Sequence, residues 1–261
     1  MTESVTDQAS IQDIKFSFLY STFTLLCGAV LVLVSLLSEG VTAFGRVLHS
    51  PQLLVLAALY ELGKICLVRT LSGHGSSLSL SLPTSQENSK PIRGPLLRKV
   101  CVKLSRLVTR LRPVWEVSKG LVILVLAWLV LLYITVCFGA PVTSAWRETG
   151  TFCLLLVLLT VYPCLLVEGP SLATLQRVYT THPGLASQTT LQTLHCNALY
   201  TVGGAWLGAV PLPLDWDRDW QVWPISCCLG AAGGHLLANL LATLRTWPLL
   251  ASITTHKRKL I

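Results

Sequence analysis

Six long apolar stretches alternate with shorter polar segments along this chain. Each stretch reaches or approaches the roughly 20 residues that a helix needs to cross the hydrocarbon layer of a bilayer. We therefore predict six membrane-spanning helices, over residues 16–37, 51–68, 120–138, 151–167, 197–214 and 222–244. Glu61 and Lys64 interrupt the second stretch, and the fifth is short and ends in prolines, so the sequence leaves the boundaries of these two spans open.

The composition agrees with a membrane protein. Hydrophobic residues make up 52% of the chain and charged residues only 12%, whereas a soluble domain carries about 25% charged residues. The net charge of +8 arises from one loop and one tail, not from a basic surface on a soluble domain. We therefore expect membrane lipids as partners, and no nucleic acid.

The distribution of lysine and arginine predicts the orientation of the helices. Placing both termini in the cytosol puts the basic loop 69–119 and the basic tail 245–261 on that side, and leaves Arg46, Arg147 and Arg218 opposite. This asymmetry follows the positive-inside rule. The predicted fold is thus an all-α, polytopic membrane protein in which residues 1–261 form a single membrane domain. Within the loop, residues 96–113 have the spacing of a basic amphipathic helix lying on the cytosolic leaflet.

Small residues in the last two spans predict a tight hairpin. Two pairs of glycines have the G-xxx-G spacing that lets helices approach closely in lipid, Gly204 with Gly208 and Gly230 with Gly234, and Gly203 extends the first set. The tryptophans that flank or fill the connecting loop are Trp206, Trp216, Trp220 and Trp223. Tryptophan prefers the headgroup level of a bilayer, so we expect the loop to lie at a membrane surface. A surplus small-residue face could dock another protein.

The candidate chemistry is sparse. Asp215, Asp217 and Asp219 alternate through the loop and could hold a hard cation, but a calcium loop needs more oxygen ligands and a glycine turn. The nine cysteines include no CxxC pair and suit small buried apolar residues better than zinc ligands. The segments outside the predicted spans contain no recognisable catalytic set. We expect no metal, no cofactor and no catalytic residue.

Polar residues inside the spans are the other candidates. Ionisable groups at membrane depth usually pair or line a polar cavity. Glu61 and Lys64 lie one helical turn apart and either pair with each other or contact a lipid headgroup or partner helix. His235 and Asn239 share one helix face, which favours hydrogen bonds between helices over a proton relay. At the C-terminus, Lys257 and Lys259 resemble a dilysine retrieval signal of endoplasmic reticulum membrane proteins, and an ordinary positive-inside tail is the alternative.

Several motifs together resemble one family. They are GAWLGAVPLPLDW at 204–216, WQVWPISC at 220–227, FGAP at 138–141, PCL at 163–165 and GP at 169–170. These motifs resemble the PIG-F family of glycosylphosphatidylinositol (GPI) anchor biosynthesis, and the resemblance covers the C-terminal half of the chain.

The resemblance implies an accessory role in the endoplasmic reticulum membrane. It implies a non-catalytic subunit that stabilises PIG-O and PIG-G, the enzymes that add ethanolamine phosphate to the third and second mannoses of the GPI precursor. We expect the partner or lipid interface in the last hairpin, at Gly204, Trp206, Gly208, Asp215, Trp216, Trp220 and Trp223. Two alternatives stay open, a lipid-modifying enzyme that uses the three aspartates and a small lipid transporter or scramblase that uses the intramembrane polar positions.

Overall fold

The described residues form an all-helical fold. The computed structural model describes the chain except for residues 1, 39–50, 73–94, 142, 181–188, 215–217 and 260–261. These described residues contain no strand, and they form seven α-helices and one 3-10 helix: α1 (Thr2–Ser38), α3 (Pro51–Ser72), α4 (Pro95–Cys137), α5 (Trp146–Glu168), α6 (Leu172–Thr180), α7 (Thr189–Ala209), η1 (Asp219–Gln221) and α8 (Ile225–Lys259). The predicted all-α class is confirmed.

Three of these helices have the length and apolarity of membrane spans. They cover Val114–Cys137 in α4, Trp146–Glu168 in α5 and Ile225–Ile253 in α8, with the search limited to the described part of the chain. The other predicted spans, 16–37, 51–68 and 197–214, fall in α1, α3 and α7. Polar residues of these three helices pair with one another, as the site described below shows.

Two predicted boundaries differ from the structure. The fifth predicted span begins at residue 197 and ends at 214, but α7 begins at Thr189 and ends at Ala209. Prolines 211 and 213 stop it early, because proline cannot donate the next helical hydrogen bond. Residues 95–119, predicted as part of a loop, form the first part of α4. The segment 96–113 is therefore continuous with the span, because α4 runs through Pro113 without a break. Its position on the cytosolic leaflet stays a prediction.

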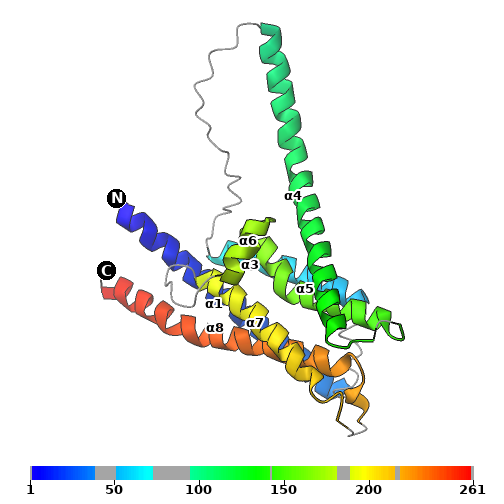
Figure 1. The fold of residues 1–261 in the computed structure, drawn as a ribbon. Helices are drawn as coiled ribbons and strands as arrows, with labels where there is room; N and C mark the ends of the chain where they lie inside the picture. Colours follow the sequence, from blue (N-terminus) through cyan, green and yellow to red (C-terminus); the bar gives the residue numbers. More distant parts are fainter. Residues whose placement is uncertain are drawn as a thin grey trace.

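The helices form a bundle in which α1, α7 and α8 run beside one another, and the N- and C-terminal ends lie on the same side (Figure 1). The most extensive packing joins α7 to α8. Helix α4 packs along α5, and its first part extends well beyond the bundle (Figure 1).

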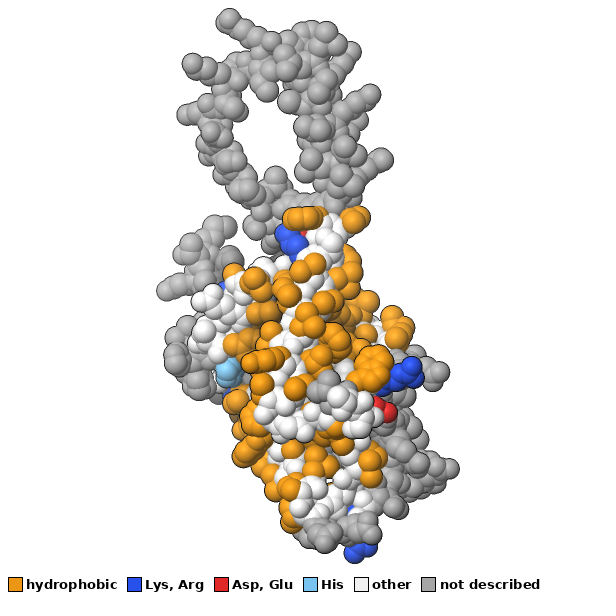
Figure 2. Space-filling view, turned by 45° about the vertical axis from the view of Figure 1, so that its right-hand side comes forward, with side chains coloured by type: hydrophobic (Ala, Val, Ile, Leu, Met, Phe, Trp, Pro, Cys, Tyr) orange, Lys and Arg blue, Asp and Glu red, His pale blue; other side chains and the backbone are white. Residues whose placement is uncertain are grey.

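Helices α4 and α5 differ sharply in burial. Most of α5 is enclosed, with Cys153 and Cys164 fully buried and Leu156 almost so. The span of α4 has almost no fully buried side chains, and Figure 2 shows hydrophobic side chains covering the face that it forms. Lipid tails are as apolar as leucine, so such a surface is stable in a bilayer. Helix α5 is therefore the centre of the fold and α4 its edge.

Candidate functional site

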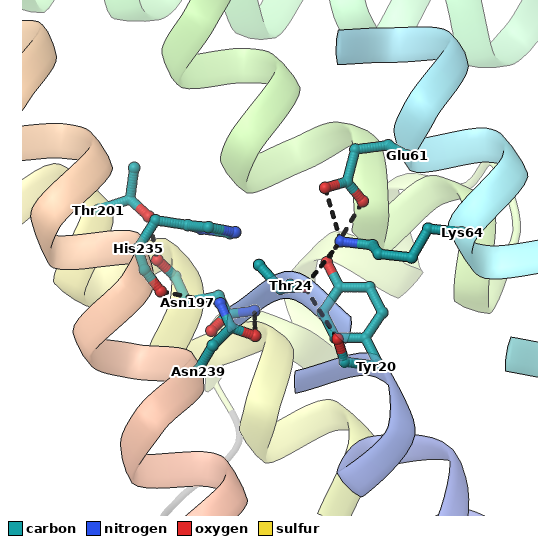
Figure 3. Close-up of polar contacts among 8 residues, drawn as sticks. All are labelled: Tyr20, Thr24, Glu61, Lys64, Asn197, Thr201, His235 and Asn239. Carbon is teal, nitrogen blue, oxygen red and sulfur yellow. Dashed lines mark hydrogen bonds and ion pairs between the residues drawn. The ribbon is translucent and has the colours of Figure 1, made fainter. Parts of the chain in front are cut away.

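Glu61 and Lys64 form a buried ion pair in α3. Lys64 Nζ lies 2.7 Å from Glu61 Oε1, and the two residues are only 2% and 4% exposed, Lys64 being the more buried. Lys64 also donates a 2.9 Å hydrogen bond to Thr24 Oγ1 in α1. Tyr20 donates a 3.5 Å bond to Glu61 Oε2, and its ring centroid lies 4.0 Å from Lys64 Nζ (Figure 3). The pair is thus mutual, and its further hydrogen bonds are with α1 of the same chain.

These contacts explain how two charges persist in an apolar bundle. The lysine and glutamate neutralise each other, and the threonine hydroxyl and tyrosine ring of α1 supply further favourable contacts for the ammonium group. The net contribution of a buried pair is small because both ions lose their hydration, but removing one partner costs about 3–5 kcal/mol. The pair therefore specifies how α1 and α3 fit together more than it adds stability.

His235 and Asn239 in α8 bond to two polar residues of α7. Thr201 Oγ1 lies 3.2 Å from His235 Nδ1, and Asn197 Nδ2 donates a 3.5 Å bond to Asn239 Oδ1. Asn239 Nδ2 also donates a 2.8 Å bond to the His235 carbonyl oxygen. All four side chains are buried. The interhelical hydrogen bonds that the spacing predicts are present, and they link the two helices of the hairpin.

The two polar groups face each other across the bundle. In Figure 3 the His235 ring extends toward the side on which Thr24 and Lys64 lie. Within the described part of the chain, His235 Nε2 and Ser21 Oγ are buried and have no hydrogen-bond partner. We call the residues of the two polar groups the polar seam. They are Tyr20, Thr24, Glu61, Lys64, Asn197, Thr201, His235 and Asn239. The hydrogen bonds of this seam link α1 to α3 and α7 to α8.

The predicted glycine hairpin is also present. A side chain added at Gly204 would overlap the carbonyl oxygen of Gly230 and lie 3.1 Å from the Gly234 Cα, and one at Gly208 would overlap the carbonyl oxygen of Ser226. Gly230 and Gly234 meet the backbone of α7 equally closely. The two G-xxx-G faces therefore pack against each other within the chain.

Gly203 and Trp206 lie elsewhere on α7. A side chain added at Gly203 would meet no atom within 4 Å, and the same holds for Gly233 in α8. Trp206 is 59% exposed, with Leu207 beside it at 63%. These residues belong to the outward face of the hairpin, whereas Gly204 and Gly208 face inward.

The structure describes only some residues of the loop between α7 and α8. Trp223 is half-buried, donates a 3.0 Å hydrogen bond to Thr149 Oγ1 and packs edge-on against Phe152. Trp220 lies in η1 and is half-buried. Asp215, Trp216 and Asp217, and the side chains of Asp219, Lys257 and Lys259, lie outside the described residues. No group of side chains suited to a metal ion occurs in the part of the chain that the structure describes.

Sequence reasoning missed half of the seam, namely Tyr20, Thr24, Asn197 and Thr201. The available signal was their spacing. Each pair lies four residues apart in an otherwise apolar segment, as His235 and Asn239 do, so each pair shares one helix face. Which faces meet could not be read from spacing alone.

Comparison with known proteins identifies the region that contains the hairpin. The family model described as the GPI biosynthesis protein family Pig-F matches residues 103–243, which is more than half of the chain. The chain belongs to this family. The PIG-F match includes most of α4, all of α5, α6 and α7, and α8 as far as residue 243, so it includes the glycine hairpin and the α7–α8 half of the seam.

Individual relatives support the same assignment. The human protein named "GPI ethanolamine phosphate transferase, stabilizing subunit" is 41% identical over 111 residues, which cover 42% of this chain and 50% of that protein. The Neurospora crassa protein named "Glycosylphosphatidylinositol anchor biosynthesis protein 11" is 33% identical over 165 residues, covering 63% of this chain and 56% of that protein. The chain thus spans about half the length of these PIG-F relatives. No solved structure matches the chain.

Proposed function

We propose that this chain is a non-catalytic, stabilising subunit of the GPI ethanolamine phosphate transferases. Its partners would be catalytic subunits of the PIG-O and PIG-G type, which add ethanolamine phosphate to mannoses of the GPI-anchor precursor. The observation that carries the proposal is the PIG-F match over residues 103–243. The name of the human relative, a stabilising subunit of such a transferase, supports the accessory role.

We propose further that the chain is one multi-pass domain of the endoplasmic reticulum membrane. In this proposal six helices cross the bilayer and both termini are cytosolic. The positive-inside distribution supports the orientation, as does the position of both chain ends on one side of the bundle (Figure 1). Lys257 and Lys259 would act as a retrieval signal. Replacing both with serine should then move the tagged chain from the endoplasmic reticulum to later compartments, and unchanged localisation would contradict that role.

We place the partner surface on the outward face of the hairpin. Gly203 precedes Gly204 by one residue and Gly233 precedes Gly234 by one, so each lies about 100° around its helix from the α7–α8 contact. Because the two helices are antiparallel, these rotations bring both glycines to the same side. Trp206 and Leu207 border Gly203 there and are exposed. A partner helix can approach closely at such small residues and pack against the large ones beside them. Asp215, Trp216 and Trp220 would extend this surface at the end of the hairpin.

Affinity purification of the tagged full chain from mild detergent tests the function. The expected result is a stoichiometric ethanolamine phosphate transferase subunit, identified by mass spectrometry, whose level in cells falls when this chain is removed. A chain that purifies without any such enzyme, from cells that express it, would overturn the proposed function.

A matched pair of variants tests the surface separately. Gly203→Leu adds bulk to the outward face, and Gly63→Leu adds the same bulk at a helical glycine of α3 that also has open space around it. We expect Gly203→Leu to lose the co-purifying enzyme and Gly63→Leu to retain it, with thermal unfolding unchanged in both. If Gly203→Leu still binds the enzyme, the surface is wrong while the function stands.

A further inference from the structure

A groove opens between α1 and α8 near the ends of the chain that lie side by side in Figure 1. Its volume is about 380 Å³, and its lining is apolar apart from a single lysine. The lining residues are Lys15, Phe18, Leu19, Trp247, Leu250 and Ala251. The rings of Phe18 and Trp247 lie 5.7 Å apart across the two helices. The shape and lining suit an apolar chain.

The lysine of this groove has no anionic partner among the described residues. Lys15 is exposed, and the two ion pairs in the described part of the chain join Glu61 to Lys64 and Glu116 to Lys119. The carboxylate nearest in sequence, that of Asp13, accepts hydrogen bonds from α7. The groove therefore combines an apolar wall with a positive charge that no carboxylate of the described residues pairs with.

The depth of the groove follows from the predicted spans. Lys15 immediately precedes the span predicted to begin at residue 16, and Trp247 follows the span predicted to end at residue 244. Tryptophan and lysine are the residue types that favour the boundary between hydrocarbon and headgroups. The groove thus opens at the level where a phospholipid carries its phosphate, on the side to which positive-inside counting assigns the cytosol.

We propose that this groove binds one anionic glycerophospholipid of the cytosolic leaflet. One acyl chain would lie between Phe18, Leu19 and Leu250, and the headgroup phosphate would pair with Lys15. Phosphatidylcholine would occupy the apolar groove equally well and also carries a phosphate, but its choline cation offsets that charge. It would therefore gain less from Lys15 than a lipid with a net negative headgroup. This inference is independent of the proposed role in GPI-anchor biosynthesis, and it rests on the proposed span boundaries and orientation of the chain.

Photo-crosslinking of the purified full chain in nanodiscs tests the site. The probes are phosphatidylserine and phosphatidylcholine that carry the same diazirine-labelled acyl chain, each at low fraction in phosphatidylcholine. Mass spectrometry reports labelling of peptides that contain residues 15–19 or 247–251. One lysine near the surface contributes about 1 kcal/mol toward anionic lipid, so phosphatidylserine should label these peptides roughly fivefold more than phosphatidylcholine.

Three variants separate the charge from the groove. Lys15→Gln should reduce phosphatidylserine labelling to the phosphatidylcholine level, whereas the control Lys119→Gln, at a half-buried lysine outside the groove that pairs with Glu116, should not. Ala251→Trp should reduce labelling by both lipids, because it fills the groove. Equal labelling by the two lipids in the unmodified chain, or no effect of Lys15→Gln, would overturn the proposal. Unchanged thermal unfolding of each variant shows that its fold is intact.

Discussion

The indole N–H of Trp223 donates a 3.0 Å hydrogen bond to the hydroxyl oxygen of Thr149, 74 residues earlier in the chain. That hydroxyl in turn donates a 2.8 Å bond to the carbonyl oxygen of Pro141. The loop of the α7–α8 hairpin is thereby tied to the first turn of α5 and to the connection that follows α4. This explains why a tryptophan at the end of the hairpin is half-buried and not free at the membrane surface.

Trp223→Phe tests this link. Phenylalanine can still pack edge-on against Phe152 but cannot donate the hydrogen bond. We expect a loss of about 1 kcal/mol in the free energy of unfolding, because a typical protein hydrogen bond contributes that much. Thermal unfolding in detergent measures it. In the background of Thr149→Val the same replacement should cost much less, and equal costs in both backgrounds would contradict the link.

Lys64→Met is expected to be the most damaging single change in the polar seam. It leaves Glu61 buried and unpaired, which costs about 3–5 kcal/mol. The double variant Glu61→Leu with Lys64→Met should recover most of that loss, since no charge then remains at the site. Unfolding by denaturant in mixed micelles gives both values. A double variant as unstable as the single one would show that the charge pairing is not what matters there.

Gly204→Ala and Gly203→Ala add the same methyl group to α7, on the side that faces α8 and on the side that does not. The added methyl group at Gly204 overlaps the backbone of Gly230, and such overpacking costs roughly 1–3 kcal/mol. At Gly203 the methyl group meets open space, and alanine favours a helix over glycine by up to about 1 kcal/mol. We expect the first variant to melt lower than the parent and the second to melt at or above it. The reverse order would mean that α7 is rotated relative to this structure.

Asp13→Ala tests how α1 holds the start of α7. Asp13 accepts a 2.7 Å hydrogen bond from Thr189 Oγ1 and a 3.4 Å bond from the Thr190 backbone N–H, at the first residues of α7. A carboxylate there satisfies free amide groups and complements the helix dipole, which together contribute about 1 kcal/mol. Hydrogen exchange of the amides of residues 189–192 should become faster in the variant. Exchange unchanged in those amides, but faster elsewhere, would rule out a capping role.

Sequence reasoning succeeded where one helix supplies the whole pattern. Apolar length predicted the helices, and the spacing of Gly204 with Gly208 and of Gly230 with Gly234 predicted the hairpin that they close. Sequence reasoning failed where a contact depends on how a second helix is oriented. That Lys64 would bond to Thr24, or that Gly203 would face outward while Gly204 faces α8, depends on the rotation of each helix, and residue spacing does not fix that rotation.

Both members of the buried ion pair belong to α3, and this has a consequence for biosynthesis. A lone lysine in a nascent helix would enter the bilayer as an uncompensated cation and would have to wait for an acidic partner from another segment. Glu61 precedes Lys64 by one helical turn and is therefore synthesised first. When α3 reaches the translocon, the lysine already has an acidic partner in the same helix. The predicted span 51–68 can insert as a neutral unit, before any later helix has been made.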